Sequence, residues 1–166
     1  MDLLDSLAQR LGEALQAAGA QVTTAESCTG GGIAEAITRI AGSSAWFEAG
    51  FVTYSNRQKT LQLDVPEALF EQVGAVSEEV VTAMALGAQQ RAGARFAVAV
   101  SGIAGPGGAV PGKPVGTVWL AWRDGEKLRT ERQVFAGDRA AVRQQTQVRA
   151  LEVLLAFLTE EKGPQV

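Results

Sequence analysis

The chain has 166 residues, of which 46% are hydrophobic and 20% are charged, and its formal net charge is −3. This composition predicts a folded globular protein, and the weak negative charge gives no electrostatic basis for binding nucleic acid or an anionic membrane surface. The length predicts a single domain over residues 1–166. The acidic N-terminus and the lack of a long apolar run argue against a signal peptide and a membrane span, so we expect a cytoplasmic protein.

The side-chain inventory restricts the chemistry further. The chain contains no histidine and a single cysteine. Ser-His-Asp catalysis, Cys-His catalysis and histidine-ligated metal sites are therefore excluded, and one cysteine cannot form an internal disulfide or a zinc-binding cluster. A base acting at neutral pH must then be a carboxylate, a lysine or tyrosine with a shifted pKa, or water activated by a bound ion.

Helical and strand patterns alternate in the first half of the chain. Leucines at i, i+4 spacing predict a helix over residues 2–18, which Gly19 ends. A strand over 21–26 follows and leads through three glycines into a helix that runs to Ile40. Further elements expected in this half are a strand over 47–54, a short helix after the turn or cap pair Ser55-Asn56, and another short helix opened by Pro66.

The second half predicts one more buried strand, a long loop and a hairpin. Ser77 caps a helix that Gly93 ends, and a continuous apolar run predicts a strand buried on both faces. The expected elements are this strand over 96–101, a glycine- and proline-rich loop over 102–114, hairpin strands over 115–122 and 128–135, a last helix over 138–160 and a polar tail over 161–166. Together they predict an α/β fold, a three-layer α/β/α sandwich on a mixed, mostly parallel sheet with a late β-hairpin.

A polar turn joins the first strand to the next helix. Ser27 lies in this turn, directly before the run of glycines. Backbone amides at such a turn attract negative charge, so the serine could act as a nucleophile beside ready-made oxyanion donors. A helix-capping serine is the structural alternative. The turn differs from the G-x-S-x-G elbow of other hydrolases because Ala25 holds the first glycine position.

Five ordered motifs identify a family. They are Ala25-Glu26-Ser27-Cys28-Thr29-Gly30-Gly31, Gly50-Phe51-Val52-Thr53-Tyr54-Ser55-Asn56 with Lys59, Gly74-Ala75-Val76-Ser77, Ser101-Gly102-Ile103-Ala104-Gly105-Pro106 and Lys113-Pro114-Val115-Gly116-Thr117-Val118. Over about residues 5–158 the chain closely resembles the C-terminal domain of the CinA family, in its stand-alone form of PncC-type nicotinamide-nucleotide amidases. The resemblance implies hydrolysis of nicotinamide mononucleotide to nicotinate mononucleotide and ammonia, with no metal or organic cofactor.

The resemblance also implies a catalytic group built on a serine and a lysine. Ser27 is the expected nucleophile and Lys59 the expected base, which requires a substantially neutral amine. The hydroxyl of Tyr54 is expected to relay a proton or to orient Lys59. The alternatives from sequence alone are an ordinary exposed lysine and a core tyrosine with a satisfied hydroxyl.

The remaining site residues are expected to bind substrate. Glu26 could orient the lysine or bond to backbone amides, with structural support of the turn as the plainer alternative. The amides of residues 28–31 are the candidate oxyanion hole. The loop after residue 101 is expected near phosphate or ribose, although a flexible turn is the alternative. Two arginines four residues apart could hold a 5′-phosphate, or simply form a solvated helix face. The expected substrate-binding residues are Glu26, Cys28, Thr29, Gly30, Gly31, Ser101, Gly102, Gly105, Arg139 and Arg143.

Two other functions compete with this amidase hypothesis. The same loops and arginines could form a non-catalytic nucleotide-binding module in which Lys59 stays protonated and exposed. The family name also suggests the hypothesis of an interaction protein linked to competence, DNA uptake or repair. The net charge argues against direct contact with nucleic acid. Oligomeric state stays open, because Trp46, Phe47, Trp119 and Trp122 fit either the core or a homo-oligomer interface.

Overall fold

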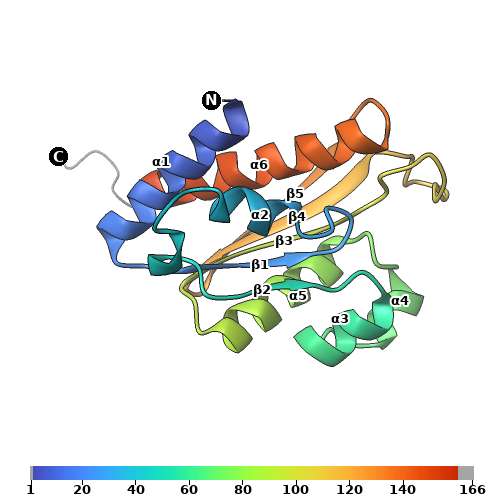
Figure 1. Ribbon diagram of the computed structural model, residues 1–166. Coiled ribbons are helices and arrows are strands. Elements are labelled where there is room, and N and C mark those ends of the chain that lie inside the picture. Colours follow the sequence, from blue (N-terminus) through green and yellow to red (C-terminus); the bar gives the residue numbers. More distant parts are fainter. Residues whose placement is uncertain (1, 161–166) are drawn as a thin grey trace.

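A computed structural model describes residues 2–160 (Figure 1), so the polar tail predicted for 161–166 lies outside the described residues. The elements are α1 (Leu3–Ala18), β1 (Val22–Glu26), α2 (Gly32–Thr38), the 3₁₀ turn η1 (Ser43–Ala45), β2 (Gly50–Val52), α3 (Asn56–Leu63), α4 (Ala68–Gln72), α5 (Glu78–Ala92), β3 (Phe96–Gly102), β4 (Thr117–Asp124), β5 (Lys127–Val134) and α6 (Arg139–Glu160). Among these helices, none combines the length and apolar character needed to cross a membrane.

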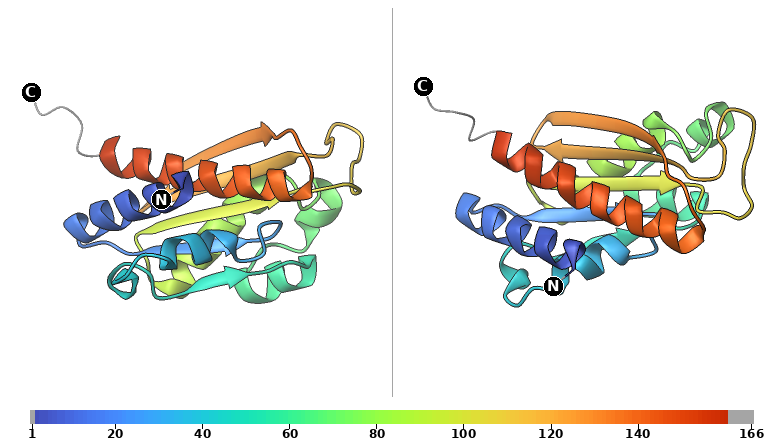
Figure 2. Two further views of the ribbon diagram at one scale, coloured as in Figure 1. Left: turned by 45° about the horizontal axis from the view of Figure 1, so that its top comes forward. Right: turned by 90° about the horizontal axis from the view of Figure 1, so that it is seen from above.

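The five strands form one mixed sheet in the order β2-β1-β3-β4-β5. β1 pairs in parallel with both β2 and β3, and β4 is antiparallel to both of its neighbours, so four strands share one direction. Helices α1, α2 and α6 cover one face, and α3, α4 and α5 cover the other (Figure 1). Figure 2 shows α1 and α6 side by side over the sheet. The predicted sandwich and hairpin are confirmed.

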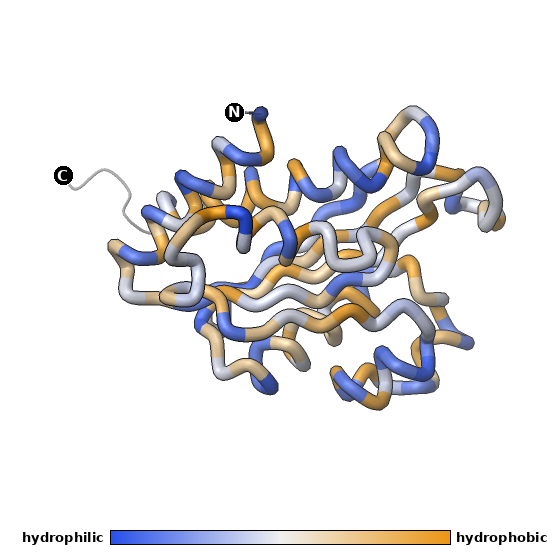
Figure 3. The backbone as a smooth tube through the Cα atoms, viewed as in Figure 1, coloured by the Kyte–Doolittle hydropathy of each residue, from blue (hydrophilic) through white to orange (hydrophobic). Residues whose placement is uncertain are grey.

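The two faces of the sheet differ in the size of their side chains. Large residues such as Phe96, Leu120 and Trp122 pack under α1 and α6, whereas Ala25, Ala99 and Ala121 face α5. Alternation along each strand produces this division, because successive side chains point to opposite faces. Figure 3 shows hydrophilic residues recurring along the outer helices, around the largely apolar strands. These small residues let α5 lie close to the sheet.

Several predicted boundaries are confirmed by their cap geometry. Gly19 and Gly93 end α1 and α5 in the left-handed conformation, and the hydroxyls of Ser55 and Ser77 cap α3 and α5. β2 is shorter than predicted: its pairing starts at Gly50, where a side chain would meet the Thr24 hydroxyl. The hairpin turn is also tighter than predicted, because β4 and β5 extend to within two residues of each other.

The aromatic residues that fitted either core or interface pack in the core or, partly buried, against it. Trp46 and Trp122 are 4% and 0% exposed, and the Trp122 indole donates a hydrogen bond to the Ala150 carbonyl. Phe47 packs against the cluster under α1 and α6, and Trp119 packs against the cluster under α5. The fold itself therefore accounts for these four side chains.

Two side-chain hydrogen bonds at residues 112 and 113 fasten the later part of the long loop between β3 and β4 to its surroundings. The Lys113 amine donates to the Val73 carbonyl at 2.6 Å, and Arg132 on β5 donates to the Gly112 carbonyl. The loop leaves the sheet at the carboxyl end of β3, next to the turn that follows β1 (Figure 1). Ligands in open α/β sheets bind at this edge, so the loop is placed to contribute to a site.

Candidate active site

The turn after β1 places Ser27 at the carboxyl end of the middle strand of three parallel strands. The Ser27 amide continues the strand pairing by donating to the Val100 carbonyl at 3.2 Å. Gly30 and Gly31 then adopt φ values of 58° and 100°, which side chains rarely tolerate, and the Gly30 amide closes the turn on the Ser27 carbonyl. The glycines thus make possible a sharp reversal that leaves the Ser27 side chain at the edge of the sheet.

Lys59 from α3 contacts the serine directly. Its Nζ lies 3.0 Å from Ser27 Oγ and 3.1 Å from the Tyr54 carbonyl oxygen. The Lys59 side chain is 1% exposed, so the alternative of an ordinary exposed lysine is wrong. Burial lowers the pKa of Lys59 to about 8, because the charged amine loses hydration. A neutral amine at this distance can accept the hydroxyl proton of Ser27.

The thiol beside the serine is not placed to react. Cys28 is buried, and desolvation raises its pKa to about 11, so the group is a protonated thiol at neutral pH. The thiolate is the reactive form of cysteine. The hydroxyl of Ser27, with an amine at hydrogen-bond distance, is the nucleophile that the geometry favours.

The backbone of the turn presents unused donors. Within the described chain, the amides of Cys28, Thr29 and Gly31 donate to no backbone carbonyl, whereas the Gly30 amide donates to the Ser27 carbonyl. Three of the four amides predicted as an oxyanion hole are therefore open. Amides fixed beside a nucleophile can hold the negative oxygen that forms when the nucleophile attacks a carbonyl group.

Glu26 explains why the turn keeps its shape. Its carboxylate is fully buried and accepts hydrogen bonds from the Thr29 hydroxyl, from the Ile33 amide at 2.8 Å and from the Ala34 amide at 3.0 Å. Of the two roles considered for Glu26, bonding to backbone amides is the one the structure shows. The carboxylate also occupies the first amides of α2, so the open anion-binding donors belong to the turn.

Tyr54 contributes to the site differently from the prediction. Its side chain is 61% exposed, so it is not a core residue, and its hydroxyl accepts a hydrogen bond from Arg139 at 2.9 Å. Arg139 also donates to the Gly105 carbonyl in the loop after β3. The contact with Lys59 comes from the Tyr54 carbonyl oxygen rather than from its hydroxyl. Tyr54 therefore links the lysine to α6 and to the long loop.

The remaining predicted residues lie around the same edge. Arg143 on α6 donates to the Thr29 carbonyl at 3.2 Å, and its Nε is buried without a partner in the described chain. Gly30 leaves room for this guanidinium, since a side chain there would meet it. Ser101 is buried at the end of β3, next to β1, and Gly102 packs against β4. Turn, lysine, loop and arginines thus meet at one edge.

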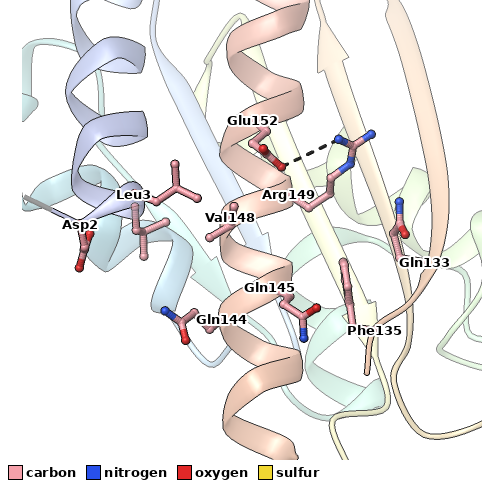
Figure 4. A pocket seen from close by; sticks show the side chains of 10 residues that line it. Asp2, Leu3, Gln133, Phe135, Gln144, Gln145, Val148, Arg149 and Glu152 are labelled. Atoms are coloured by element: carbon pink, nitrogen blue, oxygen red, sulfur yellow. Dashed lines mark ion pairs between the residues drawn. The ribbon is translucent and has the colours of Figure 1, made fainter. Parts of the chain in front are cut away.

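A cavity lies away from the Ser27 site. It has a volume of about 590 Å³ and opens between the start of α1, β5 and α6 (Figure 4). Arg149 projects beside it and pairs with Glu152 at 3.9 Å and with Glu131 on β5 at 2.6 Å. Its lining includes no residue of the turn or of α3, and the guanidinium of Arg149 already has carboxylate partners. This cavity is separate from the Ser27 site.

Comparison with known proteins identifies the family. The sequence profile of the CinA C-terminal domain matches residues 4–158. The chain belongs to this family. The family resemblance drawn from the five sequence motifs is therefore confirmed, over nearly the same residues as predicted.

Relatives of this CinA-family chain carry a specific name. A protein from Pseudomonas putida called nicotinamide-nucleotide amidohydrolase PncC is 69% identical over 160 residues, covering 96% of this chain and 100% of the relative. A protein of the same name from Escherichia coli K12 is 56% identical, covering 91% of this chain and 92% of the relative. Both similarities cover nearly the whole of this chain.

Solved structures of CinA-family proteins share the fold. A CinA superfamily protein from Klebsiella pneumoniae 700603 is 40% identical with a TM-score of 0.92, covering 95% of this chain and 98% of that one. A competence/damage-inducible protein from Agrobacterium tumefaciens is 43% identical with a TM-score of 0.92, covering 96% and 97%. The similarity covers the sheet, both helical layers and the turn that carries Ser27.

Proposed function

We propose that this chain hydrolyses the carboxamide of nicotinamide mononucleotide to nicotinate mononucleotide and ammonia. The observation that carries the proposal is the buried Lys59 amine, 3.0 Å from the Ser27 hydroxyl, beside three open backbone amides. Membership of the CinA family and the names of the PncC relatives support the substrate. The buried, unpaired thiol of Cys28 fits a cytoplasmic protein, where thiols stay reduced.

The first half of the reaction forms an ester on the serine. Ser27 Oγ bonds to the carboxamide carbon while the Lys59 amine takes the hydroxyl proton. The carbonyl oxygen becomes negative and receives hydrogen bonds from the open amides of Cys28 and Thr29. The carbon–nitrogen bond then breaks, and the Lys59 ammonium gives its proton to the departing nitrogen. Ammonia leaves, and Lys59 is neutral again.

The second half releases the product. A water molecule attacks the ester carbon and passes a proton to Lys59, and the same amides hold the oxygen of the second intermediate. The bond to Ser27 Oγ breaks, the serine recovers its proton from Lys59, and nicotinate mononucleotide forms. One lysine can serve both halves because its lowered pKa leaves much of the amine neutral near the working pH and makes the proton, once taken up, easy to return.

The rest of the nucleotide is expected along the same edge of the sheet. Arg139 and Arg143 project from one face of α6 toward the long loop and the turn, where their guanidinium groups suit a phosphate. Ser101 and Gly102 at the end of β3, with Gly105 beyond, suit close approach of the ribose.

Ammonia release from nicotinamide mononucleotide tests the function. We expect the wild type to release ammonia and the Ser27→Ala and Lys59→Ala variants to lose at least about 10³-fold in kcat/KM. Ser44→Ala, at an exposed serine, is the control and should match the wild type. Mass spectrometry of acid-quenched enzyme should find the ester on the peptide that contains Ser27. Nucleotide binding by the wild type without ammonia release would favour the non-catalytic module instead.

A further inference from the structure

An unpaired hydroxyl lies beside the catalytic pair. Thr53 follows β2 and is fully buried, and its Oγ1 has no hydrogen-bond partner within the described chain. A buried hydroxyl without a partner is unfavourable, so this group needs an explanation. Neither the five motifs nor the fold assigns it a role.

The strand register places Thr53 next to Ser27. The Thr53 amide donates to the Glu26 carbonyl at 2.9 Å, which continues the parallel pairing of β1 with β2 by one residue. Neighbouring parallel strands lie about 4.8 Å apart, so residues 27 and 53 are cross-strand neighbours. The Tyr54 carbonyl, one residue further, accepts the hydrogen bond from the Lys59 amine. Thr53 is thus the cross-strand neighbour of Ser27 and the chain neighbour of Tyr54, the two residues that contact Lys59.

The alternation of the strands also puts the Thr53 side chain on the face where Lys59 lies. Ala25 and Phe51 pack in the cluster under α5, so residues 27 and 53, two positions further along each strand, share that face. Val52 points the other way, toward Gly31. The contact between Lys59 and Ser27 confirms that α3 reaches this face.

Two other buried hydroxyls without partners do not share this position. Thr24 lies in the middle of β1, and its hydroxyl approaches Gly50 rather than the end of the strand. Thr60 lines a groove between α3 and α4 together with Arg57 and Phe70. Of the three threonines, Thr53 alone combines burial with a place beside Ser27.

Building on the proposed amidase reaction, we propose that Thr53 is a positioning residue whose hydroxyl accepts a hydrogen bond from Lys59 when the amine carries the proton of Ser27. The ammonium has three N–H groups. One donates to the Tyr54 carbonyl, one is transferred to the departing nitrogen, and the third is directed to Thr53. The Thr53 hydroxyl then accepts this hydrogen bond only while Lys59 is charged during turnover.

Burial and one neighbouring group, Cys28, account for the shifted pKa of Lys59. Cys28 is the ionisable neighbour that acts on its pKa, and this thiol stays neutral up to about pH 11. The residues of α5 that reach the same cluster are apolar, including Val80, Val81 and Met84. A change in the titration of Lys59 caused by a substitution at Thr53 can therefore be attributed to the hydroxyl.

The test compares kcat/KM for ammonia release against pH in Thr53→Val, Thr53→Ser, Thr24→Val and the wild type. Thr53→Val removes the acceptor and destabilises the ammonium, so the acid limb should move to lower pH by about 0.5 to 1 unit. The plateau should fall about tenfold, because the protonated lysine is less stable in the transition state. Thr53→Ser should restore both values, and Thr24→Val should change neither.

The outcomes separate the two proposals. A wild type that releases no ammonia overturns the proposed function. An active wild type whose pH profile is unchanged in Thr53→Val, or a shift that Thr53→Ser fails to restore, overturns the role of Thr53 alone. Thermal unfolding of each variant checks that it is folded. If Thr53→Val does not fold, Thr53→Cys gives the same comparison, since a thiol is a poor hydrogen-bond acceptor of similar size.

Discussion

At the scale of single residues, the proposed chemistry depends on the burial of Lys59. A lysine in water is protonated at neutral pH and cannot take a proton from a serine. Here α3 carries the Lys59 side chain into the core, and its amine ends between Ser27 Oγ and the Tyr54 carbonyl. Loss of hydration disfavours the charged form, so burial favours the neutral amine that the proposed mechanism needs as its base.

The lowered pKa of Lys59 predicts the pH dependence of the reaction. Because the base must be neutral, kcat/KM for ammonia release should rise with pH through about 8 and fall tenfold per pH unit below it. Ammonia release measured from pH 6 to 10 checks this, and a profile that is flat between pH 6 and 9 contradicts it. Lys59→Arg is the matched variant. It keeps the charge but cannot give up its proton, so it should be inactive across the range.

At the scale of elements, one carboxylate joins the end of β1 to the start of α2. Glu26 accepts from two amides of the first turn of α2 and from the Thr29 hydroxyl. These bonds fix both ends of the turn that holds Ser27 and its open amides. A helix of seven residues with a glycine cap has little stability of its own, so this anchor matters.

Glu26→Ala should therefore reduce the stability of the whole protein. The substitution leaves buried donors without an acceptor and creates a cavity, so we expect a loss of about 2–4 kcal/mol in the free energy of unfolding. Chemical denaturation followed by circular dichroism measures it. Glu35→Ala, which removes an exposed ion pair with Arg39 on the same helix, is the control and should cost about 0.5 kcal/mol or less. Equal losses in the two variants would contradict the anchoring role of Glu26.

At the scale of the whole molecule, the parallel part of the sheet assembles the site. β1, β2 and β3 end at one edge, and the segments that follow them carry Ser27, Tyr54 and the long loop. Arg139 spans the site by donating to the Tyr54 hydroxyl and to the Gly105 carbonyl. Three segments that are distant in the sequence are tied together by one guanidinium.

Tyr54→Phe tests whether the Tyr54 hydroxyl holds Arg139 in place or takes part in the proton transfer. Because Lys59 contacts the Tyr54 carbonyl, the variant should keep the base in place and lose no more than about tenfold in kcat/KM. Most of the change should be in KM, because Arg139, which we propose binds the phosphate, loses its hydrogen bond to the hydroxyl of residue 54. Steady-state kinetics against nicotinamide mononucleotide measure both constants. A loss in kcat comparable to that of Lys59→Ala would instead support a proton relay through the hydroxyl.

Local signals explain why much of the fold could be predicted. Gly19, Ser77 and Gly93 act on the backbone within a few residues, so the helix boundaries that they set follow from the sequence. The length of β2 was overestimated because an apolar residue before it serves packing instead. Phe47 packs against the core before the strand pairing begins. Such a boundary depends on a neighbouring strand, which no local pattern reports.

The sequence by itself determined the family, the order of the elements and the turn that carries Ser27. Motifs, helix caps and turn glycines are signals formed by neighbouring residues in the sequence. It left open whether Lys59 is exposed, which amides are free and what Tyr54 contacts. Only the tertiary structure decided these points. Burial brings the amine to Ser27, Glu26 occupies the first amides of α2, and Arg139 holds the Tyr54 hydroxyl. The physical reason is that hydration and hydrogen-bond partners depend on residues that meet only after the sheet has formed.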